Sequence, residues 1–281
     1  MLARLRKRGR ARCCDAVVLA MRMGFQPDPW QKRLLSSRHK RILINGSRQS
    51  GKTTVVSYRI AHRLLESRSL AILLAPSERQ SKEFLRDVSR NVHSLGDALE
   101  IEREKITELE FPNGSRAVAL PGKDGTIRGY KNVAQLVIDE ASRVSDDLYR
   151  AVRPMLAVSG GELIGLSTGF GKRGWYYEAW DTAGPPSPLL NNAADLDAAA
   201  DVFGPTGWWH DEGAVWERYA VPATACPRIA RAFLEEERGA LPEAWLLQEY
   251  FCQFTEAVGQ LFGEDAVERA LEAGAGLEAW F

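Results

Sequence analysis

The sequence of 281 residues lacks the features of a membrane protein and of a disulfide scaffold. The apolar run near the N-terminus, residues 16–21, is far shorter than the roughly 20 residues of a transmembrane helix, and Asp15 and Arg22 bracket it. There are few cysteines, and none has the C-x-x-C spacing of a metal site: Cys13, Cys14, Cys226 and Cys252. We therefore expect reduced thiols in a cytosolic protein that has no membrane partner.

A net charge is also missing, because 37 lysines and arginines balance 37 aspartates and glutamates. This balance excludes a basic field over the whole surface, so any DNA contact must be local or made by an assembly that lines up one face. One local concentration of cations precedes the apolar run: Arg4, Arg6, Lys7, Arg8, Arg10 and Arg12. This stretch resembles the start of a signal peptide, but no small-residue cleavage site follows. We expect a basic arm and a short helix over residues 1–23.

A glycine loop is the most informative feature that the sequence does contain. Residues 46–53 read Gly-Ser-Arg-Gln-Ser-Gly-Lys-Thr, the G-x-x-x-x-G-K-T pattern of a phosphate-binding loop. The apolar run 41–45 predicts a buried strand before it, and residues 54–65 predict an amphipathic helix after it. Strand, loop and helix in this order are the context that the motif requires, so a chance glycine loop is the weaker interpretation.

Each residue type in this loop has a physical reason. Glycines let the backbone curl so that successive N–H groups face phosphate oxygens at a helix N-terminus: Gly46, Ser47, Arg48, Gln49, Ser50 and Gly51. Lys52 reaches the β- and γ-phosphates, and the Thr53 hydroxyl is placed to hold Mg²⁺. ATP and Mg²⁺ are therefore the expected ligands.

A second motif lies at residues 135–140, where an apolar run leads into paired carboxylates. Ligands of a parallel α/β sheet bind at the carboxyl ends of its strands, which is where these acids are expected. Asp139 is suited to hold Mg²⁺, and Glu140 to orient and deprotonate a water that attacks the γ-phosphate. Alone, the pair would be two surface acids; after a phosphate loop, the catalytic interpretation is favoured.

Two further positions have alternative interpretations on chemistry alone. Gln31 follows Trp30 in a proline-punctuated stretch, and the pair suits either adenine recognition or a turn with a core tryptophan, which is the favoured interpretation. Ser167 and Thr168 end another apolar run, where they either sense the γ-phosphate or only cap the strand.

The remaining pattern predicts a mostly parallel α/β sheet flanked by helices. Ser77 and Gln80 form a capping box for a helix through about residue 92, and Asn113-Gly114 predicts a hairpin between strands 106–111 and 116–120. Further strands are expected at residues 70–75, 162–168 and 216–221, and helices at 146–156, 173–180, 231–241, 242–251 and 265–273.

In combination, these stretches resemble the ATPase portion of the large terminase subunit of tailed bacteriophages, a DNA-packaging motor family. The similarity extends over residues 24–270, and Arg48 followed by Gln49 inside the loop is its most specific element. The motifs that carry it are residues 27–31, 46–53, 127–130, 137–141 and 166–174, together with 233–238 and 248–251 in a lid-like region. The resemblance implies a P-loop NTPase of the ASCE type with a small C-terminal lid subdomain.

The resemblance also implies a role for individual residues. Gln31 matches the adenine-recognising glutamine, and Arg48 the loop arginine that contacts phosphate. Ser167 and Thr168 match the motif thought to couple hydrolysis to movement. The family adds an arginine that acts in trans from a ring neighbour, for which the candidates are Arg86, Arg90 and Arg128. The implied partners are double-stranded DNA, the portal protein, the small terminase subunit and further copies of the chain, in the cytoplasm of the bacterial host.

The predicted organisation departs from the family at the C-terminus. We expect a basic arm at 1–23, an ATPase core at 24–183, a proline-rich linker at 184–207 and a lid at 208–281. Large terminases normally carry a nuclease domain after the ATPase, and none is expected here. Two-metal cleavage needs converging carboxylates, and the acids after the lid lie on one short predicted helix or its end: Glu264, Asp265, Glu268, Glu272 and Glu278. An ATPase without nuclease activity is therefore expected from this chain.

Other functions remain compatible with the two motifs. A helicase-like ATPase or a small-molecule kinase would share them, although a kinase would also need an acceptor site and would show no stimulation by DNA. A nuclease-less prophage remnant that binds ATP without turnover is a third alternative. The intact Lys52, Asp139 and Glu140 argue against a remnant.

Overall fold

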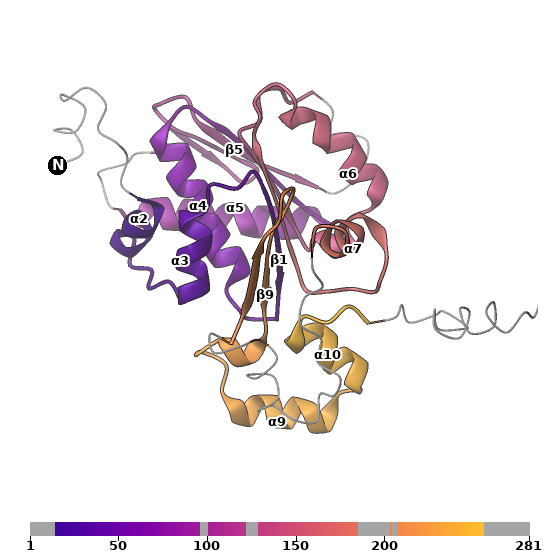
Figure 1. Ribbon diagram of the computed structural model, residues 1–281. Helices are drawn as coiled ribbons and strands as arrows, with labels where there is room; N and C mark the ends of the chain where they lie inside the picture. Colours follow the sequence, from indigo (N-terminus) through magenta and orange to yellow (C-terminus); the bar gives the residue numbers. More distant parts are fainter. Residues whose placement is uncertain (1–14, 96–100, 122–128, 185–202, 204–206, 256–281) are drawn as a thin grey trace, which may run out of the picture.

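The computed structural model describes residues 15–95, 101–121, 129–184, 203 and 207–255. Within these residues, strands form a nine-stranded sheet in the order β3-β4-β5-β2-β6-β7-β1-β9-β8 (Figure 1). In chain order the strands are β1 (Arg41–Gly46), β2 (Leu70–Ala75), β3 (Arg103–Lys105), β4 (Glu108–Glu110), β5 (Arg116–Pro121), β6 (Gln135–Asp139), β7 (Glu162–Ser167), β8 (Trp209–Glu212) and β9 (Glu217–Val221).

The central strands run parallel, and antiparallel strands close both edges. Strands β5, β2, β6, β7, β1 and β9 pair in parallel, whereas β3 and β4 continue from β5 in antiparallel fashion and β8 pairs antiparallel with β9. The predicted hairpin is present, with Glu110 opposite Arg116 across the turn. The carboxyl ends of the parallel strands therefore lie at one edge of the sheet, and a ligand site of such a sheet is expected there.

Helices cover both faces of the sheet. Helices α2 to α5 gather on one face and α6 and α7 on the other, as Figure 1 shows. Their bounds are α2 (Ala16–Arg22), α3 (Pro29–Ser36), α4 (Lys52–Glu66), α5 (Glu78–His93), α6 (Asp146–Val152) and α7 (Gly174–Asp181). The capping box predicted for α5 is formed, since Ser77 and Gln80 cap each other's backbone N–H groups. Among the described residues, no helix combines the length and apolar character needed to cross a membrane.

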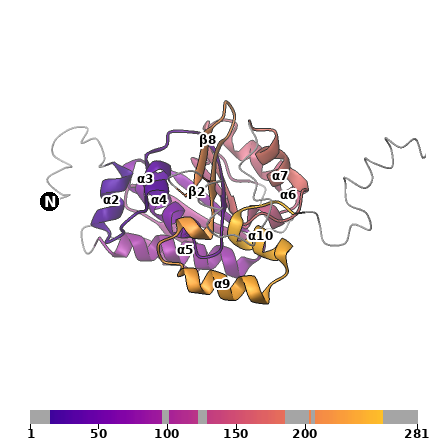
Figure 2. The same cartoon turned by 60° about the horizontal axis from the view of Figure 1, so that its bottom comes forward.

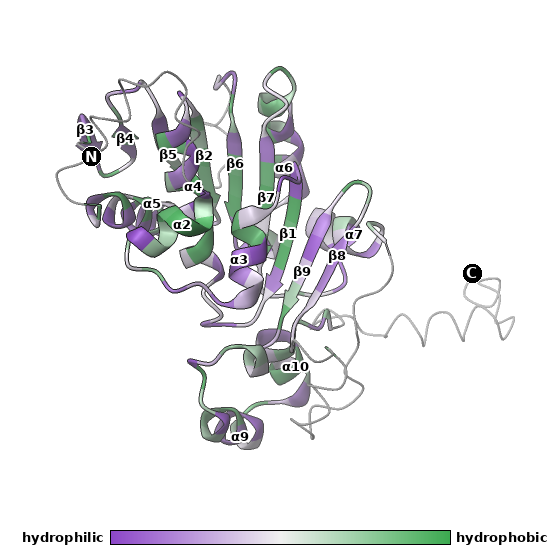
Figure 3. Cartoon of the chain, turned by 60° about the vertical axis from the view of Figure 1, so that its left-hand side comes forward, coloured by the Kyte–Doolittle hydropathy of each residue, from purple (hydrophilic) through white to green (hydrophobic). Residues whose placement is uncertain are grey.

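Apolar burial explains why the central strands lie in the middle of the sheet. Figure 3 shows the hydrophobic colouring concentrated in β2, β6, β7 and β1, whose residues are buried almost without interruption. Such continuous runs suit parallel strands covered on both faces. Alternate side chains enter two cores, one centred on Ile44, Val56 and Phe84 and the other on Leu43, Ile138 and Tyr176.

Within the described residues, the region beyond the sheet consists of two helices. Helices α9 (Arg231–Ala240) and α10 (Glu243–Phe251) lie together beyond the carboxyl ends of the strands (Figures 1 and 2). The strand expected at residues 216–221 was assigned to the lid, but it forms β9 of the main sheet, because β9 pairs with β1 from Ile42↔Glu217 to Gly46↔Val221. Strand β8, which was not predicted, pairs with β9. The boundary predicted at residue 208 therefore precedes the last strands of the core. The linker 184–207 and the helix 265–273 lie largely or wholly outside the described residues.

Two helices differ locally from the prediction. The proline-punctuated stretch before the loop is not only a turn, because Asp28 and Pro29 start helix α3, which buries Trp30 completely. The helix expected at 146–156 ends as an α-helix at Val152 and continues as a 3₁₀ turn, Arg153–Leu156. Pro154 explains this change because proline has no N–H to donate to an α-helical hydrogen bond.

Candidate functional site

The glycine loop joins β1 to α4 at the carboxyl edge of the sheet. Gln49 and Gly51 have left-handed backbone angles, with φ of 60° and 83°. A Cβ added to Gly46 would lie 2.9 Å from the Ser50 Oγ, so a side chain at Gly46 would disturb the curl. Glycine suits Gly46 because it has no side chain at the close approach, and it suits Gly51 because it adopts the left-handed conformation at little steric cost.

Two other parts of the chain hold the loop from outside. The Gln31 side-chain amide of α3 lies 3.4 Å from the Gly51 carbonyl oxygen. Arg228, which precedes α9, donates to the Ser50 carbonyl at 3.3 Å and pairs with Asp28 at 2.7 Å. The loop shape is therefore fixed by contacts with α3 and with the segment that leads into the lid.

Gln31 supports the loop and presents no exposed edge. Its side chain is completely buried, and its Oε1 accepts the backbone N–H of Asp28 at 2.8 Å. Its amide nitrogen faces Gly51. In this conformation Gln31 is a capping and loop-supporting residue, so an adenine contact would require the side chain to turn.

Lys52 is a buried cation at the first turn of α4. Only 8% of the residue is exposed, and its Nζ donates to the carbonyl oxygens of Gly46 and Ser47 over long distances of 3.3 and 3.4 Å. No carboxylate among the described residues lies within ion-pair distance of it. An ammonium group held only by weak contacts to the loop is available for an anion that enters the loop.

Asp139 ends β6 at the same edge of the sheet and is suited to a divalent cation. Burial, followed by the neighbouring charge of Glu140, raises the pKa of Asp139 to about 6, while Lys52 acts in the opposite direction. The described contact of its carboxylate is with the backbone N–H of Glu140, at 2.9 Å. A Mg²⁺ ion would stabilise the ionised form, so this buried carboxylate and the hydroxyl of Thr53 fit that ion.

Glu140 follows in a left-handed conformation and contacts a hydroxyl network. Its φ is 48°, an uncommon value for a residue other than glycine. Its Oε2 lies 3.5 Å from the Ser167 Oγ at the end of β7, a weak contact. The Ser142 Oγ lies 2.6 Å from the same Ser167 oxygen and donates to the Thr168 carbonyl at 2.9 Å. Glu140 thus contacts the Ser167 hydroxyl at the end of β7, and Ser142 links that hydroxyl to the Thr168 carbonyl.

Arg48 points away from the centre of the loop toward the lid. Its Nε donates to the Glu249 Oε2 of α10 at 2.6 Å, and its backbone N–H donates to the Glu249 carbonyl at 3.0 Å. The Glu249 side chain is only 3% exposed, and Arg143 approaches its other oxygen at 3.9 Å. A buried lid carboxylate therefore holds the loop arginine.

The structure brings the two predicted motifs to one edge but leaves other predicted residues elsewhere. Arg86 and Arg90 lie on the exposed side of α5 and pair with Glu83 and Asp87. Arg128 and the acids at residues 264–278 lie outside the described residues, so their predicted roles, and the expected lack of nuclease activity, stay predictions. Ser142 and Glu249 were missed, because neither stands in a motif that the loop or the paired acids define.

Comparison with known proteins assigns the family. The model of a family described as "Terminase large subunit, T4likevirus-type, N-terminal" matches residues 43–269. The chain belongs to this family. The resemblance inferred from the motifs is confirmed, and the chain is a large-terminase ATPase domain of the DNA-packaging motor family.

Solved structures confirm the predicted fold class. The Thermus phage P74-26 large terminase ATPase domain aligns with a TM-score of 0.70 at 21% identity, covering 88% of this chain and 100% of that one. The large terminase of another thermophilic bacteriophage aligns with a TM-score of 0.61 at 14% identity, covering 85% of this chain and 57% of that one. The HK97 bacteriophage large terminase aligns with a TM-score of 0.52 at 18% identity, covering 95% of this chain and 52% of that one. The chain thus spans little more than half the length of the last two proteins.

Proposed function

We propose that this chain hydrolyses ATP at the carboxyl edge of its sheet and uses the energy to move double-stranded DNA. The observation that carries the proposal is Lys52, a buried cation without a carboxylate partner among the described residues, at the mouth of a loop that shares its edge with Asp139 and Glu140. Structures of the thermophilic bacteriophage's large terminase in complex with ADP and with ATP-gamma-S support a nucleotide as the ligand of this fold.

Each residue of the site has a task in this proposal. The N–H groups of the loop and the Lys52 ammonium bind the β- and γ-phosphates and place the γ-phosphorus for in-line attack. Thr53 and Asp139 would hold Mg²⁺, which neutralises the charge of the phosphate oxygens when bound. Glu140 orients the attacking water and accepts its proton. Ser167 positions the Glu140 carboxylate when its single proton is donated to Glu140 and not to Ser142.

The proposed partners follow from the family. DNA movement requires double-stranded DNA and a ring of further copies of the chain, and packaging requires the portal protein and the small terminase subunit. The proposed location is the cytoplasm of the bacterial host. An arginine that acts in trans from a ring neighbour is part of the same proposal, with Arg86, Arg90 and Arg128 as its candidates.

The ATPase rate with and without linear double-stranded DNA tests the proposal. A translocating motor is expected to hydrolyse ATP faster in the presence of duplex DNA, and single-stranded DNA is expected to stimulate less. Equal stimulation by single strands would favour a helicase-like ATPase. An ATPase rate that ignores both nucleic acids, together with phosphate transfer to a small acceptor, would favour a kinase and overturn the proposal.

Arg48→Ala is expected to lower the rate of ATP hydrolysis more than it lowers nucleotide affinity. In the proposal the Arg48 guanidinium leaves Glu249 and reaches the γ-phosphate, where charge changes most during the reaction. A surface charge with no such role would leave both kcat and KM near their wild-type values. Steady-state kinetics over a range of ATP concentrations separates the two parameters.

The control for this experiment follows from the buried carboxylate. Arg48→Ala leaves Glu249 with only the distant Arg143, and a buried charge without a close partner costs stability. Arg48→Ala combined with Glu249→Gln removes that cost. If the double variant recovered both a normal melting temperature and a normal kcat, the loss in the single variant would be structural and Arg48 would have no contact with the reacting phosphate.

A further inference from the structure

The edge of the sheet opposite the glycine loop carries a cluster of cations. Backbone hydrogen bonds place the strand starts there side by side: Leu163 N–H to the Lys40 oxygen, Glu162 N–H to the Ala134 oxygen and Ala134 N–H to the Leu70 oxygen, at 2.9, 2.9 and 2.8 Å. Cations flank these starts, and we call them the basic edge: Arg38, Lys40, Arg41, Arg68, Lys131 and Arg153. All but Arg41 are exposed, and Arg41 is half-buried.

The cations of the basic edge are not neutralised by carboxylates. Within the described residues, none of the six lies within ion-pair distance of a carboxylate. Some exposed arginines elsewhere do have such partners, as Arg33 has Glu212 and Arg238 has Glu235 at 2.9 and 2.8 Å, whereas Arg79 and Arg173 have no ion pair within the described residues. Six cations without an ion pair within the described residues make this edge locally positive, although the chain has no net charge.

Two of these cations lie close enough to repel each other. Burial lowers the pKa of Arg41, and the charge of Arg153 lowers that pKa further. The Arg41 guanidinium is held by backbone oxygens of Lys40 and Gly161, both at 2.8 Å, whereas Arg153 lies over the ring of Tyr149. The charges of Tyr149 and Glu162 act on the pKa of Arg41 in the opposite direction. An anion that contacts both guanidinium groups would relieve the repulsion between Arg41 and Arg153.

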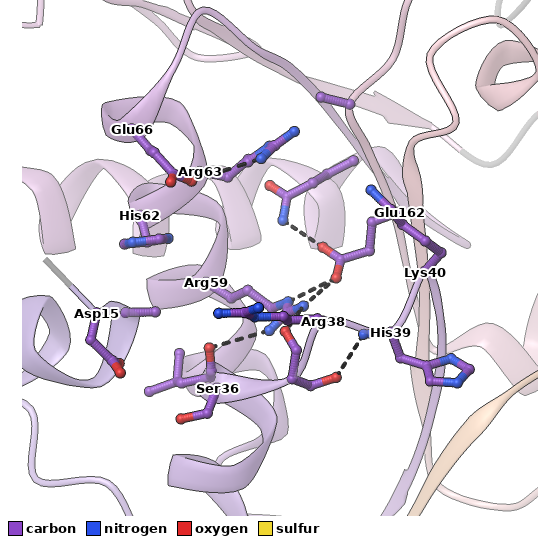
Figure 4. Close-up of a pocket in the computed structure, with 15 residues that line it drawn as sticks. Asp15, Ser36, Arg38, His39, Lys40, Arg59, His62, Arg63, Glu66 and Glu162 are labelled. Carbon is purple, nitrogen blue, oxygen red and sulfur yellow. Dashed lines mark hydrogen bonds and ion pairs between the residues drawn. The ribbon is translucent and has the colours of Figure 1, made fainter. Parts of the chain in front are cut away.

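A cleft opens at this edge, and cations are among its lining residues. It has a volume of about 480 Å³ and lies between α4 and the strand starts, with Arg38, Lys40 and Arg63 among its cations (Figure 4). Arg59 and Glu162 pair at its buried floor and cancel each other. The two acids at its rim already have partners: the Asp15 carboxylate caps α2, and the Glu66 carboxylate lies 3.7 Å from the Arg63 guanidinium. Positive charge therefore remains in excess around the cleft.

We infer that the basic edge binds the phosphodiester backbone of double-stranded DNA. The cations span the starts of β2, β6, β7 and β1, three strand spacings of about 4.8 Å each. Duplex DNA carries about one charge per 1.7 Å of its axis, so an edge of this length faces several phosphates at once. A rigid row of unpaired arginines and lysines matches a repeating polyanion better than it matches a single small anion.

This inference rests on the proposed function and adds the DNA-contacting face to it. The DNA would lie at the edge opposite the ATP site, with the sheet between them. Hydrolysis and DNA binding then use different residues, so variants separate the two activities.

The test compares two double variants that remove the same charge. Arg38→Gln with Arg153→Gln removes two cations of the basic edge, and Arg33→Gln with Arg238→Gln removes two arginines that already have carboxylate partners. Affinity for a short labelled duplex is measured by fluorescence anisotropy between about 50 and 200 mM salt. The ATPase rate without DNA and the melting temperature are measured on the same samples. Lys40→Gln with Lys131→Gln is a second basic-edge variant, used if the first is less stable than the wild type.

The basic-edge variants are expected to bind the duplex roughly tenfold or more weakly at low salt. The slope of the logarithm of the binding constant against the logarithm of the salt concentration is expected to become shallower by about 0.9 for each phosphate that is no longer neutralised. The control variant is expected to bind like the wild type, and the DNA-free ATPase rate to be unchanged in all of them. Equal affinity of basic-edge and control variants overturns the inference and leaves the proposed ATPase intact. A wild-type chain that hydrolyses ATP but does not bind the duplex overturns it as well, whereas a wild-type chain without hydrolysis contradicts the proposed function itself.

Discussion

Glu140→Gln is expected to reduce ATP turnover by roughly 10²-fold or more, the scale of removing a general base. Glutamine has the same size and keeps a hydrogen-bond acceptor for the Ser167 hydroxyl, but its amide oxygen is not basic. The attacking water would therefore be held without losing its proton. ATP binding is expected to persist, because the loop and Lys52 are unchanged.

Rapid-quench measurement of a single turnover, together with binding of a fluorescent ATP analogue, separates these two effects. Asp139→Asn is the comparison, because it removes a charge at the neighbouring position and is expected to weaken binding of Mg²⁺-ATP. Loss of ATP binding in Glu140→Gln, with normal binding in Asp139→Asn, would show that the two roles are exchanged.

Lys52→Ala is expected to abolish most hydrolysis while the protein stays folded. Its ammonium is aimed at the transferred phosphoryl group, and removal of one preorganised electrostatic contact costs roughly 10²–10³ in rate. The residue is largely buried, with 8% of its surface exposed. Its removal breaks no ion pair among the described residues, because its described hydrogen bonds are two long ones to backbone oxygens.

The matched control is Lys32→Ala, which removes an exposed lysine of α3 on the same face of the sheet. Both variants are followed by phosphate release and by thermal melting. A Lys52→Ala protein with a normal melting temperature and most of the wild-type rate would remove the glycine loop from the catalytic site.

The fold and the two acids of the site were predictable because their signals are local. The loop pattern predicts the strand before it and the helix after it, with bounds correct to within about one helical turn. Continuous apolar runs identify the buried parallel strands. Asp139 and Glu140 could be assigned to the carboxyl edge because a strand that ends in acids places them there whatever the strand order.

The contacts that complete the site could not be predicted from local sequence. Arg48 pairs with Glu249, 201 residues further along the chain, and nothing in either segment specifies the other. Ser142 reaches Ser167 only because β6 and β7 are neighbours in the sheet. The position of β9 beside β1 also depends on tertiary pairing, since a short strand after a linker fits a core and a lid equally well.

Phosphate release by the wild-type chain shows whether this site hydrolyses ATP, on which every other proposed role depends. The rate is measured with ATP in Mg²⁺, then in excess EDTA, with Lys52→Ala at the same concentration as the blank for contaminating ATPases. We predict repeated turnover by the wild type that EDTA abolishes and that Lys52→Ala lacks. No turnover by a folded wild-type chain, or the same rate in Lys52→Ala, would contradict ATP hydrolysis at this site.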